Sequence, residues 1–239
     1  MKITFLGTRG EIERRTELHR RHSSLLVAHR GRRVTIDCGA DWLGQIPRPS
    51  PDAMVLTHAH PDHVGGLRGG SPCPVYATDA TWRAIERYDI AERAVVRSRV
   101  PVTIGGIVFE AFPLEHSLRA PAVGYRISAG KVTVFYAPDV VSIHAQRQGL
   151  AGIGLYVGDG ASTVRPIVRR RNGALIGHAS IRDQLDWCAG EGVTRAIFTH
   201  CGSEVVRGHQ HAVARVAALG RERGVDAGIA YDGMEVTLR

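Results

Sequence analysis

Several features of membrane and secreted proteins are missing from this sequence of 239 residues. No apolar run approaches the length of about 20 residues that a membrane-spanning helix needs. Residues 1–6 have the pattern of a strand and not that of a signal peptide. The four cysteines are far apart and show no paired spacing, which favours reduced thiols over a disulfide framework. We therefore expect a cytoplasmic protein without a membrane partner.

Aromatic side chains and lysines are also scarce. Aromatic residues make up 6% of the chain, so no obvious platform exists for stacking the bases of a single nucleic-acid strand. Arginine carries most of the positive charge, and the formal net charge is +8 with a pI near 9.8. This excess favours acidic partners such as nucleic acid or other phosphate-bearing substrates. High genomic GC content produces the same arginine-rich composition, and composition alone does not separate the two explanations.

The remaining composition is that of an ordinary globular protein. Apolar residues make up 44% and charged residues 23% of the chain, whose length suffices for a substantial core. Short strands are predicted mainly as hairpins in each half of the chain, with helices between them. This order predicts an α/β fold in which two mixed sheets pack face to face with helices outside. A single domain over residues 1–239 is the simplest organisation.

Two segments in the second half have clear local signals. Ser180 begins a predicted helix and has the capping-box spacing to Asp183. Residues 79–88 and 208–223 are predicted to form the other main helices. The last residues, 227–238, are predicted to close the chain as a hairpin around a two-residue turn.

Three histidines and an aspartate crowd into six residues directly after an apolar run over residues 53–56. They are His58, His60, Asp62 and His63. Imidazole and carboxylate are the ligands that borderline divalent metals prefer, and a loop at a strand end can fold several onto one centre. A solvated polar loop is the alternative, but four such residues rarely gather without a reason. We predict a metal site here.

A catalytic metal site needs further ligands and an open position for water. Three later residues offer them, each at the end of a predicted strand: His116, Asp139 and His200. Taken singly, each is an ordinary polar residue capping a strand. Together with the histidine cluster they form a candidate ligand set.

The pattern H-x-H-x-D-H formed by His58, His60, Asp62 and His63 resembles the signature of the metallo-β-lactamase superfamily. Within it the chain is most similar to the branch that contains the tRNA 3′-processing endonuclease, tRNase Z, and related phosphodiesterases. The similarity spans nearly the whole chain and is carried by residues 1–8, 23–27, 36–39, 121–126, 177–180 and 198–200. The resemblance implies a four-layer αββα sandwich.

The resemblance also implies a site with two divalent metal ions. His58, His60 and His116 would hold one metal, Asp62, His63 and His200 the second, and Asp139 would bridge them. A hydroxide bridging the metals would attack the phosphodiester, with Asp62 orienting it, and the metals would clamp the attacking and leaving oxygens. Zinc is the metal we expect, and the mixed histidine and aspartate set also suits manganese.

His178 and Asp159 are predicted to assist the reaction. In the resembled branch, a histidine at the position of His178 helps protonate the leaving oxygen, and an acidic residue at the position of Asp159 steadies it. Imidazole suits this task because its pKa lies near neutral pH, and a carboxylate beside it favours the protonated form. The alternative for His178 is a loop histidine that caps the helix beginning at Ser180.

Two departures separate this chain from the tRNA-processing enzymes. Residues 158–161 stand where those enzymes have a His-Glu-Ala-Thr segment, so one polar group is missing and the acid, Asp159, is shorter. The chain also has no room for the long Gly/Pro-rich arm that grips tRNA. We therefore expect a phosphodiesterase acting on RNA, DNA or a small or cyclic phosphodiester, and not a typical tRNase Z.

Other functions and contacts stay open at this point. Proteins of the same superfamily hydrolyse thioesters or lactones, and a scaffold that has lost its metals is a further alternative. Arg14 and Arg15 in the basic stretch 14–21, and Arg170 and Arg171 before His178, are candidates to hold substrate phosphate, or else belong to solvated loops. Enzymes of the resembled branch commonly form dimers, so a homodimer is one expected assembly.

Overall fold

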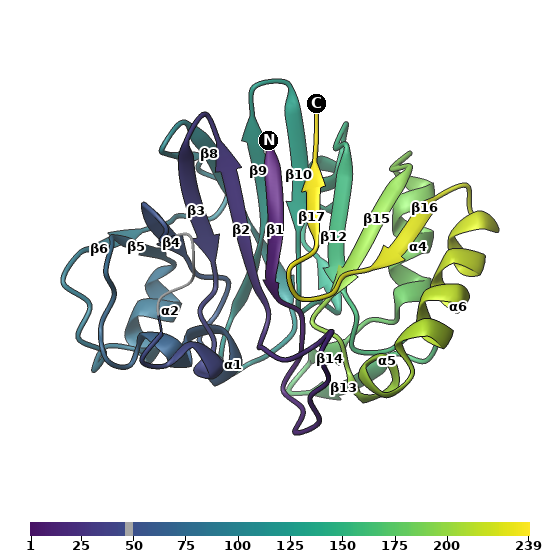
Figure 1. Cartoon of the computed structure of the whole chain (residues 1–239), viewed down its shortest axis with the longest axis horizontal. Helices are drawn as coiled ribbons and strands as arrows, with labels where there is room; N and C mark the ends of the chain where they lie inside the picture. Colours follow the sequence, from purple (N-terminus) through teal and green to yellow (C-terminus); the bar gives the residue numbers. More distant parts are fainter. Residues whose placement is uncertain (46–49) are drawn as a thin grey trace.

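The computed structural model describes residues 1–45 and 50–239. Two large sheets pack against each other (Figure 1). In spatial order, the strands of the first sheet are β17 (Glu235–Thr237), β1 (Lys2–Gly7), β2 (Ser24–His29), β3 (Arg32–Ile36), β4 (Ala53–Val55), β5 (Val75–Ala77) and β6 (Arg93–Val95). The sheet is antiparallel from β17 to β3 and parallel from β3 to β6.

The second sheet is also mixed. Its strands, in spatial order, are β11 (Ser142–Ile143), β8 (Ile107–Glu115), β9 (Ala122–Ala129), β10 (Val132–Tyr136), β12 (Leu155–Asp159), β15 (Arg195–Thr199) and β16 (Asp226–Ile229), with β7 (Val102–Ile104) paired to β8. Strands β10, β12, β15 and β16 are parallel. Because β8 and β10 both pair antiparallel with β9, the carboxyl ends of β8, β10, β12 and β15 meet at one edge.

Helices accompany both sheets. They are α1 (Pro61–Val64), α2 (Asp79–Ala84), α3 (Gln146–Leu150), α4 (Ile181–Gly190), α5 (Ser203–Arg207) and α6 (His209–Arg221), with short 3-10 turns at Ala40–Trp42 and Gly65–Leu67. Helix α2 lies outside the first sheet, and α4 and α6 lie outside the second (Figure 1). The predicted α/β sandwich of two mixed sheets with outer helices is therefore confirmed. No helix within the described ranges is long and apolar enough to cross a membrane.

Three apolar clusters account for the layers. The largest lies between the sheets, where alternate residues such as Ile3 and Phe5 of β1 face Tyr125 and Ile127 of β9. A second fills the space under α4 and α6, and a third lies under α2. Full burial of a side chain such as Phe5 contributes about 1.5–3 kcal/mol, so the period-2 pattern of the strands largely determines which face turns inward.

The sequence pattern predicts the start of α4 correctly, but it places the end of α2 too far along the chain. The Ser180 side chain accepts from the Asp183 backbone N–H, and the Asp183 carboxylate accepts from that of Ser180, so the predicted capping box is confirmed. Helix α2 ends at Ala84 and not at residue 88. The Arg93 guanidinium donates to carbonyl oxygens of residues 86, 88 and 90, which stabilises a turn there instead of further helix.

The predicted hairpin over residues 227–238 is wrong. Strand β16 pairs with β15 in the second sheet, whereas β17 pairs with β1 in the first. Asp232, in the connection, accepts hydrogen bonds from the Thr8 hydroxyl and from the backbone N–H groups of Arg20 and Arg21. Alternating apolar residues predict a strand but do not say which sheet it joins. The chain here crosses from one sheet to the other.

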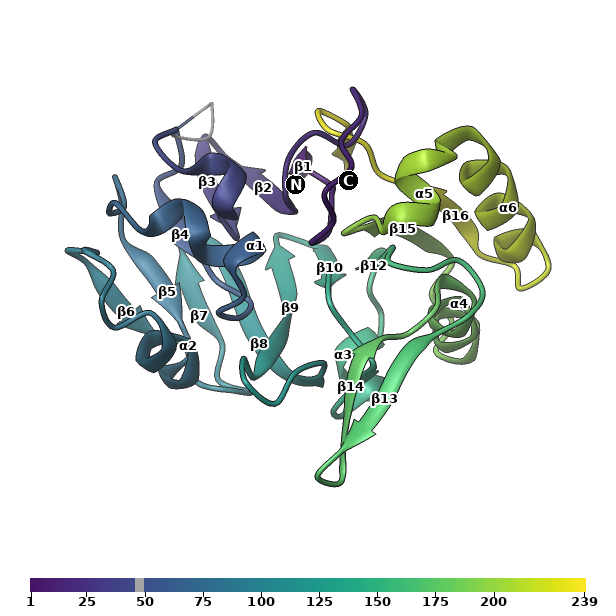
Figure 2. The same ribbon diagram turned by 90° about the horizontal axis from the view of Figure 1, so that it is seen from below.

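A separate two-stranded hairpin, β13 (Ile167–Arg171) and β14 (Ala174–His178), projects from the edge where the parallel strands end (Figure 2). Its turn is Asn172-Gly173, with φ values of 49° and 81°. Positive φ at both central residues is the requirement of the tight hairpin turn that Asn-Gly favours. This hairpin is not apparent from the sequence, because all five residues of β13 are exposed and its three consecutive arginines hide the alternation of apolar and polar residues.

Candidate metal and catalytic site

The candidate site lies at the edge where strands of both sheets end. Strand β4 leads into the loop that carries His58 and His60, and α1 follows at once with Asp62 and His63. Pro61 occupies the first turn of α1, where its missing N–H costs nothing. From the second sheet, His116 follows β8, Asp139 follows β10 and His200 follows β15. Loops of both sheets therefore converge on one point.

Ligand atoms of the first three histidines lie close together. Nε2 of His58 is 2.9 Å from Nδ1 of His60, which is 3.3 Å from Nε2 of His116. Potential ligand atoms of all three lie within 4.8 Å of one another. This is one compact group of three nitrogen donors.

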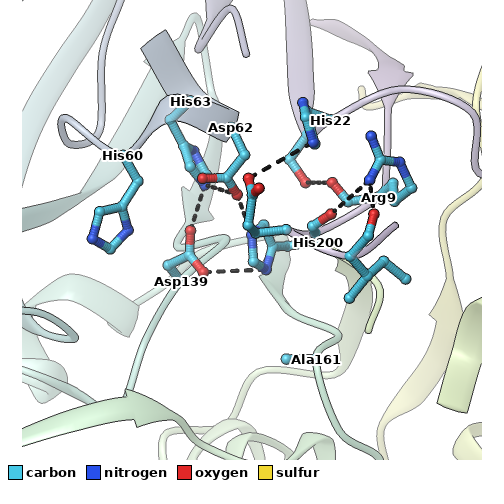
Figure 3. A network of polar contacts seen from close by, with 12 residues as sticks. Arg9, His22, His60, Asp62, His63, Asp139, Ala161 and His200 are labelled. Atoms are coloured by element: carbon cyan, nitrogen blue, oxygen red, sulfur yellow. Dashed lines mark hydrogen bonds and ion pairs between the residues drawn. The ribbon is translucent and has the colours of Figure 1, made fainter. Parts of the chain in front are cut away.

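A second group of four residues adjoins the first. His200 Nε2 is 3.1 Å from Asp62 Oδ2, and His63 Nε2 is 2.6 Å from Asp139 Oδ2. The other Asp139 oxygen lies 3.1 Å from Nδ1 of His200. Figure 3 shows these four side chains pointing toward one another. Because Asp139 Oδ2 is also 3.6 Å from His58 Nε2, this carboxylate stands between the two groups.

The buried polar atoms of the second group fit a cation. Both carboxylate oxygens of Asp139, Nε2 of His63 and Nδ1 of His200 are buried and have no partner in hydrogen-bond geometry. Buried polar atoms rarely lack a hydrogen-bond partner, because each would lose its hydrogen bonds to water without gaining others. Lone pairs that converge in this way suit a positive ion. The cluster is compatible with divalent metal binding.

Burial and neighbouring charges shift the pKa values of the cluster in different directions. Burial lowers the pKa of His58 well below its ordinary value and that of His60 to about 4. For His63, burial opposes the charge, but the carboxylates of Asp62, Asp139 and Asp37 prevail and raise the pKa. The pKa of Asp62 is lowered despite its burial, because His63 and His200 favour the carboxylate. The shifts at His58, His60 and Asp62 favour neutral imidazoles and an ionised carboxylate, which are the forms that bind metals, whereas His63 would release its proton when a metal binds.

Asp37 supports this cluster from behind, a role the sequence analysis did not assign. Its Oδ2 lies 2.8 Å from Nδ1 of His63 and also accepts from the Thr57 hydroxyl at 2.8 Å. Such a carboxylate fixes the histidine tautomer and ring orientation. A φ of 63° holds Asp37 in the left-handed region. The sequence contains one indication of its importance, because Asp37 lies in segment 36–39, which resembles the superfamily. Its contact with His63 is apparent only in the folded structure.

His178 and Asp159 form the predicted pair. Nδ1 of His178 donates to Oδ2 of Asp159 at 2.7 Å. The Asp159 carboxylate is fully buried and also accepts from the backbone N–H groups of Val140 and Ala161. Burial alone would lower the pKa of His178, but the charge and hydrogen bond of Asp159 outweigh it and raise the pKa to about 9. The buried carboxylate therefore orients His178 beside the cluster and favours its protonated form.

The ring of His178 faces the candidate ligands. Its centroid lies 5.0 Å from that of His116 and 5.5 Å from that of His200, onto which it stacks. The preceding Gly177 has a φ of +121°, and a Cβ there would meet the Ile167 carbonyl oxygen at 1.8 Å. Only glycine therefore lets β14 deliver His178 to this place.

The comparisons with known proteins agree with this geometry. Residues 32–201 match the model of the beta-lactamase superfamily domain. The chain belongs to this superfamily. Over 267 residues it is 25% identical to the Ribonuclease Z of Mycolicibacterium paratuberculosis, an alignment that covers 91% of this chain and 92% of that protein. A shorter match, 40% identical over 72 residues, covers 28% of this chain and 23% of the Ribonuclease Z of Bradyrhizobium diazoefficiens.

Solved structures of the superfamily share the fold. The metallo-beta-lactamase fold protein YhfI of Bacillus subtilis superimposes with a TM-score of 0.76 at 17% identity, covering 98% of each chain. A diphosphatase of the PhnP family gives a TM-score of 0.74 at 19% identity over 100% of this chain and 98% of the other. The predicted resemblance is confirmed. The chain is a metal-dependent hydrolase of the metallo-β-lactamase fold, related to ribonuclease Z.

Two cavities of this superfamily member meet at His178. The first, of about 580 Å³, is lined by His60, His116 and His178 together with Arg119, Arg169 and Arg171. The second, of about 470 Å³, lies on the His200 side and carries Glu11 and Glu204. A substrate at the cluster therefore has room on both sides of His178.

The four arginines predicted to contact phosphate lie in different places. Arg171 lines the first cavity, as does its strand neighbour Arg169. Arg170 is absent from that lining, and its guanidinium donates to the Gly173 carbonyl at 3.0 Å. Strand alternation explains the difference, because residues 169 and 171 share one face of β13.

Arg14 and Arg15 belong to the loop before β2. Arg14 is exposed, and Arg15 pairs with the Asp41 carboxylate at 2.7 Å. The buried Arg9 pairs with the same carboxylate and donates to the Ile12 carbonyl, so this loop is anchored firmly. A β-bridge between Arg9 and Cys201 connects this segment to the residue that follows His200 (Figure 3). Arg15 is thus engaged by Asp41, and it lines neither of the two cavities that meet at His178.

Proposed function

We propose that this hydrolase cleaves a phosphodiester bond and that His178 is its general acid. The observation that carries the proposal is the His178–Asp159 pair, which sets a protonated imidazole against the cluster. Hydrolysis of a thioester or lactone has less need of such an acid, because thiolates leave readily and a lactone alkoxide can take its proton from water. Phosphodiester cleavage breaks the bond to an alkoxide in the displacement step itself, so proton donation to that oxygen matters more.

The proposed metal ligands follow the two groups. His58, His60 and His116 hold one cation, and Asp62, His63 and His200 hold the other, with Asp139 between them. Two bound cations would activate water and stabilise charge on the phosphoryl oxygens. Zinc is the proposed metal because nitrogen donors dominate the set, and manganese is the alternative because the set also contains the carboxylates of Asp62 and Asp139.

The chain's own residues then have separate tasks. Nδ1 of His178 is bound to Asp159, so Nε2 is the atom that carries a proton to the leaving oxygen. Asp62 is ionised and accepts hydrogen bonds, which suits it to orient the attacking water. Asp139 and His200, packed against His178, hold it at a fixed distance from the reaction centre.

The substrate is proposed to be RNA or a smaller phosphodiester. The curated relatives are named Ribonuclease Z, which makes RNA the first candidate. The element that projects beside the site is the short hairpin β13–β14, and not a long arm (Figure 2). A short hairpin reaches groups near the scissile bond but not a distant part of a folded tRNA. Small phosphodiesters therefore belong in the same screen.

One assay separates the candidate reactions. Protein loaded with zinc or with manganese is tested against bis(p-nitrophenyl) phosphate, a thioester and a lactone. We expect phosphodiester hydrolysis to be the fastest of the three. Turnover of the thioester or lactone without phosphodiester cleavage would contradict the proposal, and no turnover of any substrate by metal-loaded protein would favour the non-enzymatic scaffold.

A further inference from the structure

We propose that the first cavity is a subsite for a second anionic group of the substrate, bound by Arg169, Arg171 and Arg119. The inference rests on the proposed phosphodiesterase function and narrows its substrate class. The substrate would carry one phosphate at the histidine cluster and a further phosphate on the arginine side.

The hairpin holds two arginines in line with the site. Ile167 is paired with His178, and Arg169 and Arg171 follow at alternate positions along β13. Two strand residues span about 6.6 Å, so Arg169 lies about one such step from the His178 end and Arg171 about two. Both line the cavity that also contains His60 and His116.

Hydrogen bonds fix the hairpin to the histidine cluster. The Gly177 N–H donates to the His116 carbonyl at 2.9 Å, and Nδ1 of His116 donates to the Gly177 carbonyl, also at 2.9 Å. The position of the hairpin is therefore tied to a candidate ligand. The arginines are held at a defined reach from the scissile bond.

Charge in this cavity is unbalanced. Within residues 1–45 and 50–239, no carboxylate pairs with Arg119, Arg169 or Arg171, and no acidic side chain is among the residues lining the cavity. Elsewhere in the chain, arginines such as Arg15 and Arg223 have carboxylate partners. Guanidinium groups bind phosphate through paired charge-assisted hydrogen bonds, so an unpaired set facing a cavity suits a phosphate.

The opposite cavity has the other sign. It carries Glu11 and Glu204. Glu204 accepts from the Thr163 hydroxyl at 2.7 Å and is paired with Arg215 at 3.5 Å, so Glu11 is the lining carboxylate without an arginine or lysine partner among the described residues. Like charges repel, so a strand of nucleic acid with phosphates on both sides of the scissile bond would meet repulsion here. A phosphodiester with its extra negative charge on one side only fits both cavities. This favours a small or terminal phosphodiester over the interior of a long strand.

The test compares two chromogenic substrates that differ by one phosphate. They are thymidine 5′-(p-nitrophenyl phosphate) and the same compound with a 3′-phosphate. We expect the zinc-loaded protein to cleave the 3′-phosphorylated compound with at least tenfold higher kcat/KM. In R169A/R171A this preference should fall at least fivefold, and R119A should reduce it further. R170A is the matched control on the same hairpin and should keep the preference.

Equal kcat/KM for the two compounds, or a preference unchanged in R169A/R171A, would overturn the subsite. A binding measurement distinguishes failure of the subsite from failure of the proposed phosphodiesterase function. If neither compound is cleaved, titration calorimetry with thymidine 3′,5′-bisphosphate and thymidine 5′-monophosphate decides the matter. Tighter binding of the bisphosphate by the wild type, reduced in R169A/R171A but not in R170A, supports the subsite without catalysis. Equal affinities would overturn it.

Discussion

The carboxylate of Asp159 lies 2.7 Å from Nδ1 of His178, and this contact joins the end of one sheet strand to the end of the projecting hairpin. Asp159 is fully buried, whereas His178 is partly exposed. The buried charge therefore fixes the orientation of a ring whose other nitrogen remains available.

Replacing His178 with alanine should lower kcat by about 10²–10⁴-fold, the usual contribution of a general acid. The metal content should not change, because the proposed ligands remain. Metal analysis by mass spectrometry checks the metal content, and assays of the same samples on a dinucleotide, whose leaving group is an alkoxide, check kcat. The Arg170→Ala variant is a nearby control. Loss of a cation in His178→Ala would instead make His178 a ligand.

Asp139→Ala should abolish tight binding of at least one cation. Asp139 stands between the two histidine groups, and its oxygens are buried without hydrogen-bond partners. The wild type should be stabilised by added zinc, because a ligand that binds only the folded state raises its stability. Thermal unfolding with and without zinc measures this, and an equal shift in wild type and variant would argue against the ligand role.

Asp37→Asn should weaken metal affinity by about 10–100-fold, the usual effect of removing a carboxylate behind a ligand histidine. Asparagine tolerates the left-handed backbone at this position, where φ is 63°, so the fold should survive. Competition with a chelator measures the affinity. Unaltered affinity in a folded variant would show that Thr57 alone suffices to orient His63.

Gly177→Ala should displace the hairpin and lower both stability and activity. The new Cβ would meet the Ile167 carbonyl at 1.8 Å in a backbone conformation with φ of +121°. Gly173→Ala is the matched control, since it also has positive φ, +81°, but nothing lies within 4 Å. Denaturant unfolding and kcat of both variants should separate backbone strain from the clash. Similar losses in both would refute the clash.

Stability should fall as the pH drops from about 6.5 to about 4, partly because of His19. Burial, with a further effect of His209, lowers the pKa of His19 to about 4. In the unfolded chain His19 has its ordinary pKa of 6.5, so between pH 6.5 and about 4 the unfolded chain binds a proton that the folded chain does not. Protonation therefore favours unfolding in this range, and the full stability is present above pH 6.5. The contribution of His19 to the free energy of unfolding falls by about 3 kcal/mol between these two pH values.

Denaturant unfolding at several pH values checks this effect. His19→Asn should show a shallower pH dependence than the wild type, because asparagine does not titrate. The exposed His211 provides the control variant His211→Asn, which should keep the wild-type slope. A slope unchanged in His19→Asn would assign the acid sensitivity to other groups.

Local sequence patterns sufficed for the fold class and for most strand positions. The runs rich in β-branched and aromatic residues at 132–136 and 195–199 coincide with strands β10 and β15. The capping box at Ser180 was equally readable. These signals succeed because alternation and capping depend on neighbours in the chain. They failed for β16 and β17, whose sheet partners are set by long-range pairing.

The sequence by itself determined which residue types meet at the site. The pattern from His58 to His63 is local, and the later histidines and aspartates stand at strand ends that the fold collects at one edge. The tertiary structure alone decided that Asp37 supports His63, that Arg169 and not Arg170 shares a cavity with His178, and that the opposite cavity is acidic. The physical reason is that these relations join residues distant in sequence, or depend on which face of a strand turns inward. Periodicity places side chains on alternate faces, but only packing against the rest of the molecule determines what each face meets.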